Sequence, residues 1–258
     1  MDDLTQLQVS IADHVATLTM NSPPVNALTR VLNDELTLAL DRISEMDDVR
    51  AVVLTGAGKV FCAGADLKGR AENIKGAGDM MAHSRRTREC FHAIRECAKP
   101  VIVAINGAAL GSGLAMVASS DILVASEKAS LGMPEVDVGL LGGARHAMRL
   151  FSHSKLRRMA LTGQRLGGAD LYRLGVVEAC TAPEELMVTA LEIAATIASK
   201  SPVSTRMIKH TLNVIEGMSL RDGYRYEQDQ TAAIGKTEDA KEAQLAFKEK
   251  RPPVFKGR

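Results

Sequence analysis

The sequence predicts an α/β fold in which short buried strands alternate with helices, followed by a C-terminal part that is almost wholly helical. Short apolar runs rich in valine occur at residues 49–55 and 101–105, and a glycine-containing turn closes each of them. Such runs are typical of strands buried on both faces of a parallel sheet. From residue 183 onward, apolar residues recur at helical spacing. This order of elements is typical of a layered α/β domain.

The N-terminal elements follow from local patterns. Residues 7–20 predict a β-hairpin, because Val9 and Ile11 alternate with polar neighbours before a turn and a return strand. Residues 29–46 predict a helix from the spacing of their apolar residues. Residues 56–80 hold many glycines and charges with little periodicity, so a long loop is expected there. Long loops in compact domains are often functional.

The remaining elements alternate in the same way. We expect a helix over 80–98, a short helix over 113–119, a strand over 121–125, and C-terminal helices over 186–199, 203–216 and 240–250. Ser201-Pro202 marks a boundary between two parts of the chain.

Length and composition restrict the class of protein. The 258 residues suit one larger domain, or a domain with a helical appendage. Hydrophobic residues make up 46% and aromatic residues only 3%, so the core must consist mostly of Ala, Val, Leu, Ile and Met. The formal net charge is +1, from 32 basic and 31 acidic residues. This balance argues against broad electrostatic binding of nucleic acid or an anionic membrane.

The cysteines predict free thiols. Cys62, Cys90, Cys97 and Cys180 form no C-x-x-C pair and no Cys/His cluster with zinc spacing. Free thiols suit a reducing compartment. No apolar run approaches the ~20 residues of a membrane span, and no secretory signal pattern opens the sequence. We therefore expect a cytoplasmic protein without a metal site.

Two glycine-containing segments each follow a predicted buried strand. In residues 61–68, Gly64 lets the backbone bend or approach a ligand closely. In residues 106–113, a short helix begins, and the first N–H groups of a helix are unpaired and lie at the positive end of its dipole. An oxygen that gains negative charge could bind there. In isolation, the first segment indicates only a turn, and the second only a closely packed helix start.

Residues 106–113 do not match three other glycine motifs. The spacing is wrong for the dinucleotide fingerprint G-x-G-x-x-G, and the G-K-[ST] ending of a phosphate loop is absent. A nucleophile elbow requires G-x-S-x-G, but Leu110 and Leu114 flank Ser112 at the glycine positions. We therefore do not expect Ser112 to act as a nucleophile.

A third segment, residues 131–140, places the carboxylates Glu135 and Asp137 in an apolar stretch. Burial among apolar groups disfavours the charged form of a carboxylate, which suits a group that transfers protons. The alternative is an exposed Glu in a turn after Pro134.

Together, in this order and at these separations, the three segments resemble the crotonase (enoyl-CoA hydratase/isomerase) superfamily. The resemblance covers nearly the whole chain. Further matching segments are Asn26-Ala27-Leu28, Asp121, Thr162-Gly163, and residues 246–251 and 253–255.

The resemblance implies a crotonase-like spiral of ββα units, with a C-terminal helical region that builds a homotrimer or a hexamer made of two trimers. Residues 1–200 would form the spiral core with the acyl-CoA site. Residues 201–258 would form the helical region for oligomerisation and for covering coenzyme A.

The resemblance also implies the site. The backbone N–H groups of Ala65 and Ser112 would bind the thioester oxygen, and Glu135 would transfer a proton. The family usually has Gly in place of Ser112, but the donor is the backbone in either case. Coenzyme A would be part of the substrate, with no separate cofactor. The further substrate-binding residues would be Asp66, Leu67 and Lys68, together with Phe247 and Lys250 for the coenzyme A of a neighbouring subunit.

One departure from the family pattern separates the possible reactions. Hydratases of the family usually carry a second glutamate where this chain has Ala115, which cannot move a proton. Isomerisation of a double bond needs a single base, so an enoyl-CoA isomerase is the leading hypothesis. The alternatives are a hydratase that recruits Asp137, His146 or bound water, and a low-turnover acyl-CoA-binding protein.

Overall fold

The computed structural model describes Met1 and residues 3–258 of the chain. Its N-terminal hairpin is formed by β1 (Leu7–Ala12) and β2 (Val15–Met20), which pair antiparallel as predicted. Asp13 and His14 form the turn, with φ angles of 50° and 65°. The predicted helix follows as α1 (Arg30–Glu45), and the Thr29 side chain caps it by accepting a hydrogen bond from the Leu32 N–H.

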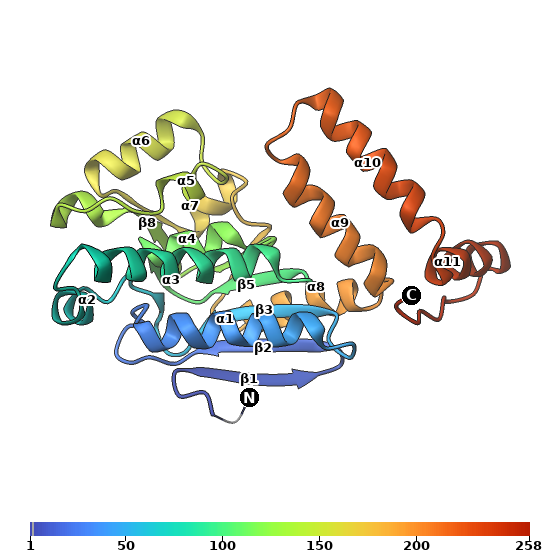
Figure 1. Cartoon of the computed structure of the whole chain (residues 1–258), viewed down its shortest axis with the longest axis horizontal. Coiled ribbons are helices and arrows are strands. Elements are labelled where there is room, and N and C mark those ends of the chain that lie inside the picture. The colour runs from blue at the N-terminus through green and yellow to red at the C-terminus, as the bar shows by residue number, and fades with distance from the viewer. Residues whose placement is uncertain (2) are drawn as a thin grey trace.

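The larger sheet has six strands in the order β1-β2-β3-β5-β7-β10. Beyond the hairpin, all neighbouring strands are parallel. The added strands are β3 (Ala51–Gly56), β5 (Val101–Ile105), β7 (Ile122–Ser126) and β10 (Ala179–Thr181). The valine-rich runs predicted as buried strands therefore form the centre of this sheet (Figure 1).

Both faces of this sheet are covered, which explains why its strands lack polar alternation. Val53 and Ile102 belong to the hydrophobic cluster that α8 (Leu186–Ala198) completes on one face. Leu54 and Val103 belong to the main core on the other face, together with the apolar stripe of α1. Alternate residues of a strand point to opposite faces, so each strand contributes to both clusters.

A second sheet has four short strands in the order β4-β6-β8-β9. They are β4 (Val60–Cys62), β6 (Ala108–Leu110), β8 (Ser130–Gly132) and β9 (Arg165–Gly167). The neighbours β4, β6 and β8 are parallel. Each of β3, β5 and β7 is followed by one of these short strands, so the chain alternates between the two sheets before each helical segment. This arrangement is the predicted spiral of ββα units.

The prediction of a long loop over residues 56–80 is wrong in part. The segment contains β4 and the helix α2 (Leu67–Asn73), and α3 (Ala77–Glu96) begins before its end. β4 has only three residues, too few for a visible pattern. α2 buries none of its residues and therefore has no apolar stripe. The Asp66 carboxylate caps α2 by accepting from the Gly69 N–H at 3.0 Å.

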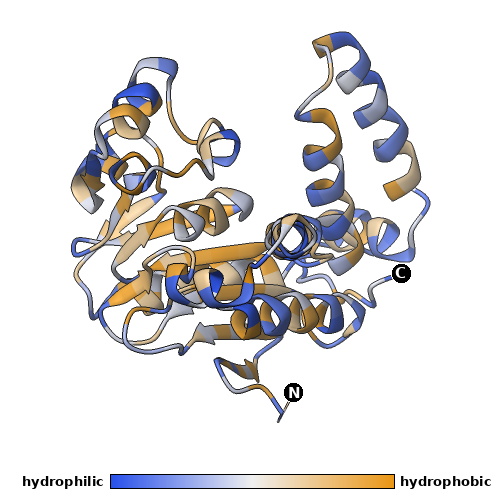
Figure 2. Ribbon diagram, turned by 60° about the vertical axis from the view of Figure 1, so that its left-hand side comes forward, coloured by the Kyte–Doolittle hydropathy of each residue, from blue (hydrophilic) through white to orange (hydrophobic). Residues whose placement is uncertain are grey.

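The C-terminal part consists of α9 (Pro202–Ile215), α10 (Leu220–Ile234) and α11 (Glu238–Glu249). Figure 1 shows α9 and α10 projecting from the core as a helical hairpin, with α11 near the C-terminus. Figure 2 shows that these helices mix hydrophobic and hydrophilic residues, whereas the core strands are mainly hydrophobic. The division of the chain into domains at residues 200 and 201 stays a prediction.

The remaining helical segments lie between β6 and β10. They are α4 (Ser112–Ser119), the 3-10 helix η1 (Pro134–Val138), α5 (Ala144–Ala147), α6 (His153–Thr162) and α7 (Gly168–Arg173). All four cysteines are free. Among the described residues, no single helix has the length and hydropathy of a membrane span; α8 and α9 would meet that test only as a pair bent by 108°.

Candidate active site

The three segments singled out in the sequence meet because of the second sheet. Residues 63–66 follow β4, Gly111 and Ser112 follow β6, and η1 follows β8. Since β4, β6 and β8 are parallel neighbours, their carboxyl ends lie at the same edge of the sheet. Segments that are 22 to 45 residues apart in sequence are thereby brought to one place.

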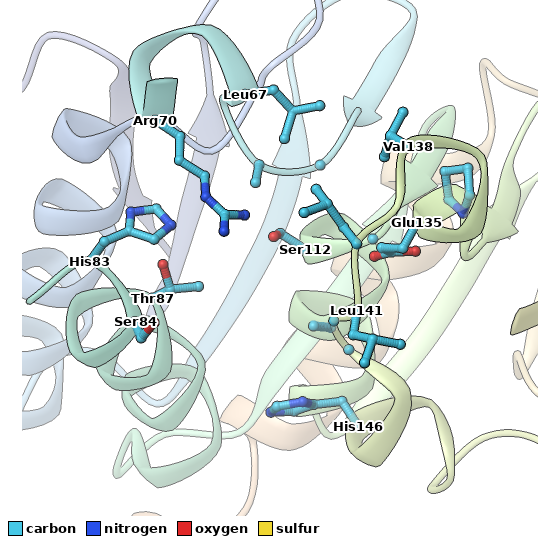
Figure 3. A pocket seen from close by; sticks show the side chains of 18 of the residues that line it. Leu67, Arg70, His83, Ser84, Thr87, Ser112, Glu135, Val138, Leu141 and His146 are labelled. Atoms are coloured by element: carbon cyan, nitrogen blue, oxygen red, sulfur yellow. The ribbon is translucent and has the colours of Figure 1, made fainter. Parts of the chain in front are cut away.

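A cavity of about 480 Å³ opens at this edge. Ala65, Ser112 and Glu135 all line it. Helices α2 and α3 supply a facing wall, and Val138, residues 140–143 and His146 close another side (Figure 3). A volume of this order suits a small-molecule ligand.

Two backbone N–H groups of the cavity wall are available as donors. Leu28 and Ala65 form a parallel β-bridge, in which the Leu28 N–H donates to the Gly64 carbonyl at 2.8 Å. In such a bridge the N–H of Ala65 points away from Leu28, and it donates to no acceptor among the described residues. Ser112 is the first residue of α4, so its N–H has no acceptor within the helix.

Glu135 lies against the turn that carries one of these donors. A Cβ atom added at Gly111 would lie 2.6 Å from Glu135 Oε1, so only glycine leaves room for the carboxylate. Gly111 also has a φ of 53°, which disfavours other residues. Glu135 Oε2 is buried and has no hydrogen-bond partner among the described residues. Burial raises the pKa of the Glu135 carboxyl, although its own backbone N–H partly opposes this change.

Ala115 lies on α4 and lines the same cavity with a fully buried methyl group. A Cβ atom added at Gly143 would lie 3.7 Å from the Ala115 Cβ, so the helix and the loop before α5 are close at this point. The position that would hold a second carboxylate in the family pattern therefore presents only a methyl group to the cavity.

Two other titratable residues weighed in the sequence also line the cavity, Asp137 and His146. The Asp137 carboxylate lies against α6, because a Cβ atom added at Gly163 would be 2.8 Å from Asp137 Oδ2. The His146 ring packs edge-on against Phe91, with centroids 5.1 Å apart. Burial, reinforced by the positive charges of nearby arginines, lowers the pKa of His146.

The predicted substrate-binding residues form two groups, residues 65–68 and the pair Phe247 and Lys250. In the first group, Ala65 and Leu67 line the cavity, whereas Asp66 and Lys68 lie beside it at the start of α2 without lining it. Phe247 and Lys250 lie at the end of α11, outside the cavity lining, and Phe247 is 88% exposed. Within one chain, the structure does not bring the second group to the first.

Several lining residues were not predicted as site residues, among them Arg70 on α2, and His83 and Thr87 on α3. His83 and Thr87 are four residues apart, so they share one face of a helix. That spacing was visible in the sequence, but nothing in the sequence indicated that this face would turn toward Glu135.

Comparison with known proteins agrees with this architecture. The family described as enoyl-CoA hydratase/isomerase matches residues 10–258. A Bacillus subtilis protein, named provisionally as an enoyl-CoA hydratase/isomerase, is 37% identical over 254 residues, which cover 95% of each chain. A Mycobacterium tuberculosis protein named (7aS)-7a-methyl-1,5-dioxo-2,3,5,6,7,7a-hexahydro-1H-indene-carboxyl-CoA hydrolase is 35% identical over 236 residues, covering 92% of this chain and 95% of its own.

A solved structure of the same family is also similar to this chain. The crystal structure of an enoyl-CoA hydratase from Bacillus anthracis matches with a TM-score of 0.93 and 33% identity, covering 98% of this chain and 100% of that one. The chain belongs to the enoyl-CoA hydratase/isomerase family, the crotonase superfamily.

Proposed function

We propose that this protein transforms acyl-CoA thioesters by proton transfer beside the thioester carbonyl, with Glu135 as the proton-transferring group. The observation that carries the proposal is a carboxylate whose buried Oε2 atom has no partner among the described residues, in the same cavity as two available N–H donors. Family membership supports the class of substrate.

The reaction needs both the two N–H donors and the carboxylate. Removing an α-proton from a thioester places negative charge on its carbonyl oxygen. The N–H groups of Ala65 and Ser112 stabilise that enolate, and one such donor is typically worth ~10²–10³ in rate. A positioned base contributes ~10²–10⁴. A carboxylate with a raised pKa suits this role, because it is a stronger base than an ordinary carboxylate and takes up the α-proton more readily.

We propose isomerisation of an enoyl-CoA double bond as the reaction. Glu135 takes a proton from the α-carbon and returns it to the γ-carbon, which moves a 3,4 double bond to the 2,3 position. No cofactor is required, because coenzyme A is part of the substrate. The buried methyl group of Ala115 supports this assignment over hydration, in which two carboxylates normally share the work.

Hydration is the second candidate, since Asp137 and His146 line the same cavity as Glu135. The lowered pKa of His146 keeps its ring neutral near pH 7, and a neutral imidazole can accept a proton from water. The third candidate, a low-turnover acyl-CoA-binding protein, needs the cavity and the donors but not the proton transfer.

We also propose that Asp66, Leu67 and Lys68 line the path of coenzyme A at the cavity entrance. Phe247 and Lys250 would reach the coenzyme A of a neighbouring subunit in a homotrimer or hexamer. Their distance from the cavity of their own chain supports a role between subunits.

The experiment is to incubate the purified protein with 2-enoyl-CoA and 3-enoyl-CoA, and to follow the isomeric, hydrated and free coenzyme A products. We expect conversion of the 3-enoyl substrate only, and loss of that conversion in Glu135→Gln. Efficient hydration of 2-enoyl-CoA would instead support a second acid or base. Tight binding without turnover would support the binding protein, and release of coenzyme A would indicate a hydrolase.

A further inference from the structure

The wall of the cavity opposite Glu135 is polar and basic. Arg70 projects from α2, and His83 and Thr87 project from α3 toward the same space (Figure 3). Ser112 lies between this group and Glu135 in the same view. A bound hydrocarbon chain would cover these half-exposed groups without giving them hydrogen-bond partners, which is unfavourable.

Arg70 has no carboxylate partner among the described residues, unlike Arg86 and Arg95 on α3. Arg86 pairs with Asp34 at 2.7 Å, and Arg95 pairs with Glu216 at 2.8 Å. The Arg70 guanidinium has only a 3.7 Å contact with the sulfur of a methionine of α3. Its other N–H groups therefore remain available to a ligand.

His83 extends the same donor surface. Burial and the positive charges of Arg70 and Arg86 lower the pKa of His83. A neutral imidazole donates one hydrogen bond and accepts one. The Thr87 hydroxyl is a further donor on the same face of α3. A guanidinium, an imidazole and a hydroxyl facing one space match the needs of an anionic oxygen group.

We propose that Arg70, with His83 and Thr87, binds a carboxylate carried by the acyl part of the substrate. The proposal rests on the acyl-CoA function above and names its substrate class: acyl-CoA thioesters whose acyl group ends in a second carboxyl group. A phosphate of coenzyme A offers the same chemistry. The position of the three side chains, in the cavity that holds Glu135 and Ser112, favours the acyl group.

Binding of unreactive thioesters tests this selectivity without any turnover. The probes are hexanoyl-CoA, adipoyl-CoA and free coenzyme A, measured by calorimetry with the wild-type protein, Arg70→Met and Arg85→Met. Arg85 is the matched control, because it is exposed on α3 and does not line the cavity. We expect wild type and Arg85→Met to prefer adipoyl-CoA, and Arg70→Met to lose about 10- to 100-fold of that preference. Arg70→Lys should keep part of it, since the charge remains.

Two outcomes would overturn the proposal. Arg70→Met could weaken the binding of free coenzyme A and of both thioesters equally, which would show that Arg70 binds a phosphate of coenzyme A. Alternatively, the wild-type protein could show no preference for adipoyl-CoA. Either result can occur with enoyl-CoA turnover intact, and turnover can fail with the preference intact, so this proposal and the proposed function are tested separately.

Discussion

At the scale of single residues, the position of Glu135 has a cost in stability that depends on pH. Because burial raises its pKa, the folded protein holds this proton more tightly than the unfolded chain does. Stability therefore falls as the pH rises from the ordinary carboxyl pKa of about 4.3 through the raised folded value. Above that value the full cost of the buried charge remains.

Glu135→Gln removes the charge and should make the protein relatively more stable at high pH. We expect the Tm difference between variant and wild type to grow in favour of the variant between about pH 4 and about pH 8. Thermal unfolding at both pH values measures it, with Glu184→Gln, on the exposed surface, as the control. A difference that stays constant or shrinks over this range would contradict the burial of the Glu135 charge.

A substitution at Gly111 tests whether the backbone turn beside Glu135 positions its carboxylate. In Gly111→Ala, the added Cβ would lie 2.6 Å from Glu135 Oε1 at a residue whose φ is 53°, so the carboxylate must move. We expect kcat to fall by about 10²- to 10⁴-fold. Gly142→Ala is the matched control, because its Cβ would lie at an ordinary 3.7 Å from the same oxygen. Equal effects of the two substitutions on steady-state kinetics would argue against a positioning role for Gly111.

At the scale of elements, a buried lysine fixes α9 to the core. Lys209 Nζ lies 2.8 Å from Asp121 Oδ2 at the start of β7, and its side chain is only 5% exposed. The ammonium also donates to the carbonyl oxygens of Ile94 at 3.3 Å and Lys99 at 3.1 Å. These contacts connect the C-terminal helices to α3 and to the parallel sheet.

Lys209→Met should lower the free energy of unfolding by about 2 kcal/mol, because the partly exposed Asp121 carboxylate and two carbonyl oxygens lose their charged donor. The Val101 N–H still donates to Asp121, which keeps the loss at the lower end of the usual range. Urea denaturation measures the change. Arg173→Gln is the control, since it breaks an exposed pair with Asp170 and should cost less than about 1 kcal/mol. Similar losses in both variants would contradict the structural role of Lys209.

The elements also explain how much of the fold was visible in the sequence. β3 and β5 were predicted because strands buried on both faces consist of continuous apolar runs. The three-residue strands β4, β6 and β8 were not predicted, because their pairing depends on neighbours far away in the chain. The same limit applies to the site: the Glu135 segment had a recognisable motif, but Arg70 reaches the cavity only through the packing of α2 and α3.

At the scale of the whole molecule, the C-terminal helices leave apolar side chains in contact with solvent in the isolated chain. Leu220 is 92% exposed, Leu212 59% and Ile208 52%. Exposed apolar surface of this kind often marks an interface between proteins. We expect sedimentation to give three or six times the 27.6 kDa chain mass, and Leu220→Asp to lower the assembled fraction. A fully active monomer would contradict the proposed assembly.

The central claim is that Glu135 removes the proton beside the thioester carbonyl. The rate at which the C–H bond of the α-carbon is broken tests this claim most directly. The measurement uses 3-enoyl-CoA deuterated at the α-carbon and follows loss of deuterium from that carbon by NMR, because deuterium returned to the γ-carbon leaves the molecular mass unchanged. Glu135→Gln should slow the loss by about 10²- to 10⁴-fold, whereas Asp137→Asn should leave it near the wild-type rate. Deuterium loss at the wild-type rate in Glu135→Gln, or its abolition in Asp137→Asn, would show that another group is the base.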